Sequence, residues 1–255
     1  MRNVWIIFRK EMRSYFVSPI AYFLLTMFAL VSAFFFGIYL RGFIEYGMEM
    51  QMTGQAAPMN LNEQVIRPLL SNVSVLGLFF IPMITMRLFA EEKRNGTIEL
   101  LTTSPIRDIE IILGKWLAAM GLYVCMLFFP ALNFVFLFKY GNPDWKPLVI
   151  GLLGLLLQVG GLLAMGMFIS TLTKNQIVAA ALTFSLFVAL WVISAVSEFN
   201  TATWAQAVSY TSIVTHLESF ERGMIDSKDA VFYLSMIFLG LFLSLRSMES
   251  LRWRS

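Results

Sequence analysis

The sequence predicts an all-α integral membrane protein with six transmembrane helices. Of its 255 residues, 58% are hydrophobic and only 14% are charged, whereas soluble domains carry about 25% charged residues. The apolar residues also form long runs, and the first of these extends from Ser14 to Leu40 without a charge. Runs of this length are what a bilayer core about 30 Å thick requires of a crossing helix.

Six runs are apolar enough to cross the bilayer, for which a helix needs about 20 residues. The predicted spans are 18–39, 72–90, 116–138, 147–173, 177–197 and 230–246. The core of the last run, Ala230–Leu245, has only 16 residues and would be about 24 Å long as a helix. It can cross only if both ends are anchored or the bilayer thins locally.

The distribution of basic residues predicts the orientation of the chain. An even number of spans places both termini on the same side of the membrane. If that side is the cytoplasm, 13 of the 19 Lys and Arg residues and 7 of the 16 Asp and Glu residues lie inside. The inner side then carries a net charge of +6 and the outer side −3, which is the asymmetry of the positive-inside rule. We therefore expect both termini to be cytoplasmic.

Residues 2–16, ahead of the first span, predict a helix that lies in the membrane interface. Two sets of side chains recur there at helical spacing: Trp5, Phe8, Met12 and Tyr15 on one face, and Arg2, Arg9 and Arg13 on another. Such a helix places its aromatic rings in the acyl boundary and its bases near anionic headgroups, so membrane lipid is an expected partner. The alternative is a basic tail that only sets the orientation.

The spans contain little that could carry chemistry. The five longer ones have no Asp, Glu, Lys, Arg or His in their interiors, although ion-coupled carriers usually keep such groups within the membrane. The chain has one cysteine, Cys125, and one histidine, His216, which we expect to be a structural hydrogen-bonding residue. No phosphate-binding loop, metal cluster or basic nucleic-acid surface is evident. The sequence thus predicts a chain that is not an enzyme and holds no cofactor or metal of its own.

Small residues in the fourth span predict a close helix contact. Gly160 and Ala164, then Gly166 and Ser170, follow small-xxx-small spacing, which lets two helix backbones approach each other. The spacing leaves open whether the neighbouring helix belongs to the same chain or to a second copy.

The loop after the second span, residues 91–105, is the most polar part of the chain and has a distinct local pattern. Asn95-Gly96 would end the helix that leaves the span. Residues 97–103 then predict a short helix, with Thr97 as its N-cap and Glu99 in its first turn. Ser104-Pro105 would end that helix.

The apolar face of this short helix is too small to be stable in water by itself. It consists of Ile98, Leu101 and, less centrally, Leu100. Two interpretations remain open from the residues alone: the helix lies on lipid headgroups, or it inserts into a cleft of a cytoplasmic protein. Charges around a compact apolar patch suit a specific and reversible protein contact.

Three stretches carry a resemblance to a known family. Glu-Glu-Lys-Arg-Asn-Gly-Thr-Ile-Glu-Leu-Leu begins at Glu91, and is followed by Thr-Ser-Pro at 103–105 and Gly-Lys-Trp at 114–116. This pattern resembles the signature loop of type-2 ABC exporter permeases, and within them the gliding-motility-type permeases. The opening, with Arg-Lys-Glu at 9–11 and Ser-Pro at 18–19, is similar too.

The resemblance implies a permease in the bacterial inner membrane that works with a second permease copy or paralogue. Each permease would bind one ABC ATPase subunit, which holds ATP and Mg²⁺ and hydrolyses the nucleotide. Residues 2–16 would be the connecting helix, 91–105 the coupling helix, and 198–229 would include re-entrant helices before the last span. The residues implied in ATPase coupling are Glu91, Glu92, Arg94, Thr97, Ile98, Glu99, Leu100, Leu101, Thr103, Ser104 and Pro105.

The first outer loop, about 41–71, is longer than the resemblance implies and rich in methionine. It could form a small outer helix or a contact for another subunit, such as an envelope accessory protein. Two other functions remain as alternatives to an exporter. One is a membrane scaffold that passes ATPase cycles to envelope or motility proteins without moving a solute, and the other is an ion-coupled carrier. No nucleic acid is expected as a partner.

Overall fold

The predicted fold class, an all-helical protein with six membrane-crossing helices, is confirmed. The computed structural model describes residues 2–53, 60–98, 106–199 and 210–252, and all regular secondary structure in these ranges is helical. Within these described residues, six helices are long and apolar enough to cross a membrane. They are built on α2 (Pro19–Thr53), α3 (Arg67–Thr85), α6 (Asp108–Tyr140), α7 (Trp145–Leu172), α8 (Gln176–Phe199) and α11 (Ser227–Arg252).

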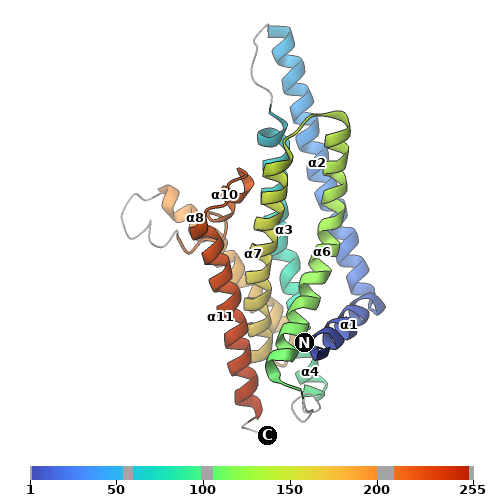
Figure 1. Ribbon diagram of the computed structural model, residues 1–255, viewed down its shortest axis with the longest axis vertical. Helices are drawn as coiled ribbons and strands as arrows, with labels where there is room; N and C mark the ends of the chain where they lie inside the picture. The colour runs from blue at the N-terminus through green and yellow to red at the C-terminus, as the bar shows by residue number, and fades with distance from the viewer. Residues whose placement is uncertain (1, 54–59, 99–105, 200–209, 253–255) are drawn as a thin grey trace.

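Shorter elements mark the two ends of the bundle (Figure 1). The basal end carries α1 (Arg2–Val17), α4 (Ala90–Arg94) and the end of α11. The distal end carries the end of α2 and a π-helical turn, η1 (Asn62–Ile66), that leads into α3. The first and last helices therefore place the two ends of the described chain at the same end of the bundle as α4.

Helix α7 is the centre of the bundle and contacts α3, α6, α8, α10 (Leu217–Glu221) and α11. Its glycines allow these close approaches. A Cβ added at Gly154 would lie 2.5 Å from the Phe220 Cβ of α10, and one at Gly166 would lie 2.7 Å from the Thr85 Oγ1 of α3. Gln158 of α7 also donates a buried 2.7 Å hydrogen bond to Ser74 of α3. The small residues of the fourth span thus contact helices of the same chain.

The contact between α7 and α11 is the most extensive in the bundle and depends on a glycine, Gly240, that no pattern in the sequence singled out. A Cβ at Gly240 of α11 would lie 2.6 Å from the Ala164 backbone carbonyl carbon. One turn away on α7, Gly160 lies against Ile237, and its carbonyl accepts a 3.0 Å hydrogen bond from the Trp116 indole. Gly160 and Ala164 therefore line one seam, whereas Gly166 and Ser170 face α3 and α4.

Three helices are clearly longer than the hydropathy pattern indicates, and one of them is α6, which begins at Asp108 although its span was expected at 116–138. The first span was expected at 18–39, but α2 continues to Thr53 and, with 35 residues, is about 52 Å long. Much of the first half of the expected outer loop is thus helical, and Figure 1 shows α2 rising past the distal ends of its neighbours. The last span was expected to be short, yet α11 has 26 residues because the helix continues through the polar residues at both ends.

The expected outer segment, 198–229, is only partly described, since residues 200–209 lie outside the described ranges. Its described part includes α10, which packs against α7 at Gly154. Gly154 is nine residues from the start of α7, or about 14 Å along the helix. Helix α10 therefore packs against the side of α7 and does not lie beyond its end.

We expect Gly240→Ala to destabilise the bundle by about 1–3 kcal/mol, because the added methyl group meets the backbone of α7 and not a flexible side chain. Thermal unfolding in detergent measures the effect. Gly37→Ala is the matched control, since nothing lies within 4 Å of a Cβ at this position of α2. Equal unfolding temperatures for the two variants would contradict the close contact between α7 and α11.

Candidate functional site

The helix that leaves the second span ends before Asn95-Gly96 as the sequence predicts, but a turn that was not predicted separates its last part, α4, from α3. After a turn at residues 86–89, α4 has Glu91 and Glu92 in its first turn and Lys93 and Arg94 in its last. This order places acids and bases where they complement the helix dipole. Gly96 follows with a φ of +72°, a left-handed conformation that is typical of a helix C-terminus and that glycine adopts at little cost.

Helix α4 is fastened to the basal end of α7 by Ser170, a residue predicted only to pack helices. The backbone N–H groups of Phe89 and Ala90 each donate a 3.1 Å hydrogen bond to Ser170 Oγ. The Ser170 hydroxyl in turn lies 3.4 Å from the Met86 carbonyl oxygen and donates to it. Backbone donors left free at a helix start are thereby satisfied, and the position of α4 follows that of α7.

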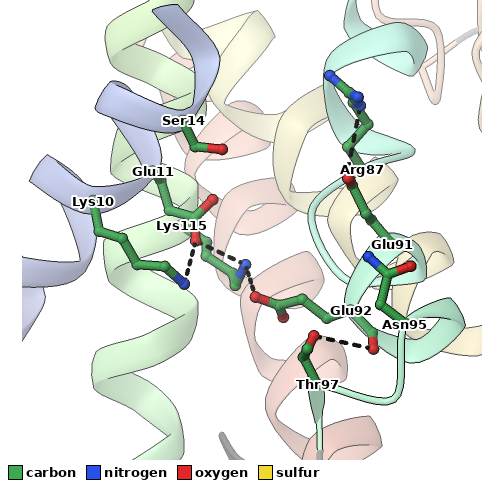
Figure 2. Close-up of a pocket in the computed structure, with 9 residues that line it drawn as sticks. All are labelled: Lys10, Glu11, Ser14, Arg87, Glu91, Glu92, Asn95, Thr97 and Lys115. Atoms are coloured by element: carbon green, nitrogen blue, oxygen red, sulfur yellow. Dashed lines mark hydrogen bonds and ion pairs between the residues drawn. The ribbon is translucent and has the colours of Figure 1, made fainter. Parts of the chain in front are cut away.

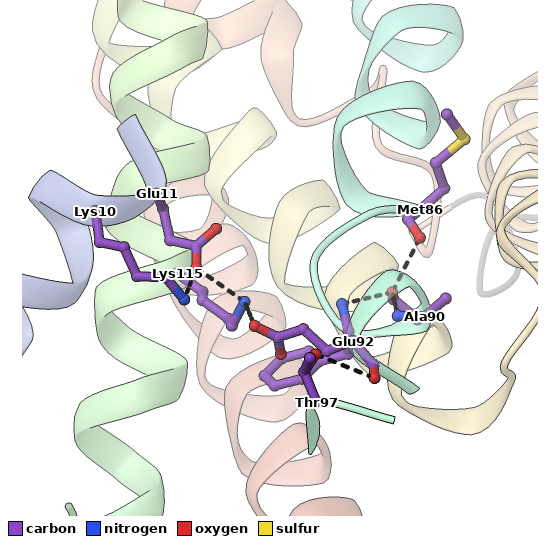
Figure 3. A network of polar contacts seen from close by, with 9 residues as sticks. Lys10, Glu11, Met86, Ala90, Glu92, Thr97 and Lys115 are labelled. Atoms are coloured by element: carbon purple, nitrogen blue, oxygen red, sulfur yellow. Dashed lines mark hydrogen bonds and ion pairs between the residues drawn. The ribbon is translucent and has the colours of Figure 1, made fainter. Parts of the chain in front are cut away.

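A buried cation joins α4 to two other helices. Lys115, in the first turns of α6, is only 2% exposed, and its Nζ lies 2.8 Å from Glu92 Oε1 of α4 and 3.1 Å from Glu11 Oε1 of α1. Figures 2 and 3 show the ammonium between the two carboxylates, which approach from opposite sides. Three segments that are far apart in the sequence therefore meet at one nitrogen atom.

The surroundings of Lys115 explain why a charge is tolerated there. Burying an ammonium costs several kcal/mol unless it is paired and hydrogen-bonded. Here two carboxylates accept from it, and its Nζ also lies 5.2 Å from the centre of the Phe89 ring, a cation–π distance. The preceding residue, Gly114, lets α1 come close, because a Cβ there would lie 2.7 Å from the Ile7 side chain.

A second set of contacts ties α4 to the start of α2. Arg87 Nε lies 3.3 Å from Glu91 Oε2, and Arg87 Nη1 donates a 3.2 Å hydrogen bond to Ser18 Oγ. Lys93 donates to the Thr171 carbonyl of α7. Contacts of α4 with α1, α2, α6 and α7 thus fix its position from several directions.

These side chains surround a polar cavity of about 430 Å³ at the basal end (Figure 2). Its lining contains three acids and three bases together with three uncharged polar residues: Lys10, Glu11, Ser14, Arg87, Glu91, Glu92, Asn95, Thr97 and Lys115. Glu92 Oε2 is buried and has no hydrogen-bond partner within the described chain. The nearby Tyr15 hydroxyl is buried as well, and burial followed by the Glu11 charge raises the pKa of Tyr15. Within the described chain, the Tyr15 hydroxyl and Glu92 Oε2 have no hydrogen-bond partner.

The structure describes only part of the predicted coupling segment. Glu91, Glu92 and Arg94 lie on α4, Arg94 is exposed, and Thr97 is an exposed residue that lines the cavity. Ile98 is half-buried and packs against the hydrophobic core. The other predicted residues fall outside the described ranges: Glu99, Leu100, Leu101, Thr103, Ser104 and Pro105.

Helix α1 divides its apolar residues between the bundle and the outside. Trp5 is exposed and stacks on half-buried Phe8 with ring centres 4.8 Å apart, and Arg9 and Arg13 are exposed. Two other residues of the helix, Ile7 and Tyr15, are buried. Tyr15 was expected on the lipid-facing side, so that part of the predicted face packs on protein instead.

No local pattern in the sequence singles out Lys115, the central residue of this site. In the sequence, Lys115 and Glu11 stand out only as charges on the predicted inner side and as parts of motifs. The residues that pair with Lys115 are distant along the chain, since Glu11 is 104 and Glu92 is 23 residues away. The one available signal was the position of Lys115 at the start of a span, where a charged residue next to glycine can be buried by an approaching helix.

A comparison with protein families decides between the broad functional classes. Residues 5–224 match the family described as ABC-2 family transporter protein. The chain belongs to this family. No curated protein matches the chain. The match covers α1 from Trp5 onward, α4 and five of the six membrane-crossing helices, so it includes every residue that lines the basal cavity.

Membership of the ABC-2 family gives the chain a general role. It is a multi-pass membrane protein and a permease subunit of an ABC transporter, and the family associates with an ABC ATPase partner. The predicted permease family is thus confirmed at this level. Groups of three or more metal-binding side chains are absent from the described residues.

Replacing Lys115 with Met should destabilise the protein by about 3–5 kcal/mol, because Glu11 and Glu92 would face each other without their shared cation. Adding Glu11→Gln and Glu92→Gln to Lys115→Met should recover most of that loss, since the unpaired charges are then gone. Chemical denaturation in detergent measures both effects. Lys10→Met is the matched control, because Lys10 is 64% exposed and contacts the same carboxylate at 3.6 Å. A loss as large for Lys10→Met would contradict the central role of Lys115.

Proposed function

We propose that this permease couples ATP hydrolysis by a separate ABC ATPase to export across the bacterial inner membrane. Segment 91–105 acts as the coupling helix region, and residues 97–104 dock in a groove of the ATPase. The observation that supports this proposal is the Lys115 contact. The carboxylate of Glu92, at the start of the segment, shares one buried cation with Glu11 of α1.

The geometry supplies a path for force. A displacement of segment 97–104 by the ATPase would be passed to α4 directly through the covalent backbone. From α4 it passes to α6 through Lys115, to α1 through Glu11, and to α7 through Ser170. Three polar contacts therefore make the basal ends of these helices move with α4, which is what a permease moved by an external motor requires.

The interior of the bundle also supports an external source of energy. Among the described residues, the buried polar contact between α7 and α3 joins two uncharged side chains, Gln158 and Ser74. Ion-coupled carriers usually bind their ion through ionisable groups at such a depth. An external ATPase, which holds ATP and Mg²⁺, fits this arrangement better than a coupled ion does.

The proposed topology places the basal end in the cytoplasm. Helices α1 and α4 and the end of α11 share this end (Figure 1), and basic residues predominate there. A second permease copy or paralogue completes the transporter, with one ATPase subunit bound to each. Helices α2 and α8 have few buried residues in their apolar windows, about 17% each, and leave outward faces for lipid or for that second permease.

A scaffold is the second candidate function. In that case the ATPase cycle would move the distal extension of α2, and the moving extension would act on envelope or motility proteins without passing a solute. The length of α2 beyond the other helices favours this candidate. ATP-dependent movement of labelled solutes or lipids in reconstituted vesicles separates the two functions, because only the exporter produces it.

Replacing both Leu100 and Leu101 with Asp should abolish co-purification of the ATPase, because two carboxylates cannot enter an apolar groove without a large desolvation cost. Pull-down from native membranes measures the association. Met52→Asp is the control, since Met52 is exposed at the distal end of α2 and should leave binding unchanged. Retention of the ATPase by the double variant would contradict docking through this segment. If no ATPase co-purifies with the wild-type protein, an ion-coupled carrier would be favoured instead.

The double variant Glu91→Ala and Glu92→Ala should still bind the ATPase but transmit little of its cycle. A coupling free energy of 1–3 kcal/mol corresponds to a change of about 5- to 150-fold, so we expect export to fall by about tenfold or more. Without a known substrate, the readout is the ATPase rate of the complex, which should return to that of the free ATPase. Glu45→Ala with Glu49→Ala, at the distal end of α2, is the matched control. An ATPase rate equal to that of the wild-type complex would overturn the role of α4.

A further inference from the structure

The only histidine of the chain is buried at the distal side of α7 and joins two segments. His216 Nδ1 lies 2.7 Å from Asp229 Oδ1 in the first turn of α11, and both side chains are 2% exposed. Its other nitrogen, Nε2, lies 2.8 Å from the Tyr210 backbone carbonyl oxygen. The ring also stacks on Phe232 with centres 3.9 Å apart. His216 thus holds segment 210–216 against the start of α11.

The two hydrogen bonds determine how many protons the pair carries. A backbone carbonyl oxygen only accepts hydrogen bonds, so Nε2 must carry a proton. The 2.7 Å contact between Nδ1 and Asp229 Oδ1 then also needs a proton, either on the nitrogen or on the oxygen. Without it, a nitrogen lone pair would face a buried carboxylate. In both forms the pair has no net charge. It holds one proton more than a neutral imidazole beside an ionised carboxylate would hold.

Nothing else in the described chain satisfies Asp229. Its second oxygen, Oδ2, is buried without a hydrogen-bond partner, so the contact with His216 is the main interaction that offsets the burial of this carboxyl group. The titratable and charged groups around the pair are Tyr210 on the loop, Glu221 on α10, Asp226 before α11, and Lys228 and Tyr233 on α11; Glu221 in turn lies near Glu218, Arg222 and Arg67.

Two of these neighbours matter for the response to pH. Lys228 pairs with Asp226 at 3.1 Å and is exposed, so its charge is largely screened by solvent. Glu221 is buried, and burial raises its pKa to about 7, with Arg67 opposing the shift. A test of the His216–Asp229 pair must therefore be able to separate its proton from that of Glu221.

We propose that His216 and Asp229 form a one-proton site that fastens segment 210–216 to α11, and that loss of this proton at alkaline pH releases the segment. The site lies at α10 and the start of α11, away from α4 (Figure 1). It therefore does not depend on the proposed coupling to an ATPase. Its ligand is the proton itself, and its effect is to make the distal side of the bundle sensitive to the pH of the medium that it faces.

The direction of the effect follows from counting protons. While segment 210–216 is held against α11, the His216–Asp229 pair holds one proton more than a neutral imidazole beside an ionised carboxylate. In a released segment, a free imidazole loses its proton near pH ~6.5 and a free aspartate near pH ~3.9. Between these values both states hold one proton, so pH has no effect. Above pH ~6.5 the released state holds none, and the opening equilibrium rises by up to about tenfold per pH unit.

Hydrogen exchange of the full-length protein in detergent or nanodiscs, followed by mass spectrometry from pH 5 to 9.5, tests the site. After correction for intrinsic exchange, the peptide that contains residues 210–216 should exchange at a constant rate up to pH ~6.5. Its rate should then rise by up to about tenfold per pH unit. Asp229→Asn should remove this rise, because the amide N–H donates to Nδ1 at every pH. Asp226→Asn is the matched control and should behave as the wild type does.

Two results would overturn the proposal. One is a flat exchange profile in the wild type, and the other is a rise that Glu221→Gln abolishes, since the proton would then belong to Glu221. Because His216 is the only histidine, imidazole ¹⁵N NMR of the histidine-labelled wild type gives a second measurement that needs no variant. It should show Nε2 protonated from pH 5 to 7. The averaged tautomers of a free histidine would contradict the site.

Discussion

The basal end of the molecule depends on one buried cation. Lys115 cannot be buried alone, because a desolvated ammonium without partners costs several kcal/mol. It therefore requires Glu11 and Glu92 to remain close to it, and with them α1 and α4. The connection differs from apolar packing in that it borders a polar cavity of about 430 Å³. Its members can exchange partners with water or with an incoming protein side chain without exposing apolar surface.

Helix α7 connects this basal network to the distal side. At its basal end Ser170 accepts hydrogen bonds from the turn before α4, and toward its distal end Gly154 receives Phe220 of α10. Between them, Gly160 and Ala164 hold α11 so closely that a single Cβ at Gly240 would collide with the backbone. Contacts of this kind resist sliding, because packed interiors have few voids into which atoms can move. Displacement of α4 would therefore reach α10 and α11 as a movement of α7 as a whole.

Hydropathy predicted the number of spans and their order, because a bilayer demands apolar length and little else. It did not predict where the helices end. The extension of α2 to Thr53 adds no apolar run, and α11 includes polar residues at both ends. Likewise, the composition of the 91–105 loop indicated a functional segment but not its anchor. Lys115 pairs with residues 23 and 104 positions away, and no local pattern distinguishes a lysine that stays in water from one that a neighbouring helix will bury.

The chemistry of the contacts around Lys115 also suits their proposed role, which is to transmit force from the ATPase to the helices. A permease that alternates between states needs a joint that transmits force and yet re-forms after each cycle. An apolar contact between helices at the membrane surface would expose hydrophobic area whenever it opened. The carboxylates around Lys115 instead face a cavity lined by three bases and three acids. Glu92 lines this cavity, and its Oε2, which has no hydrogen-bond partner in the described chain, would gain one if a donor from the ATPase entered there. Engagement of the motor would then strengthen the same network that carries its force, so coupling and docking would be favoured together rather than in competition.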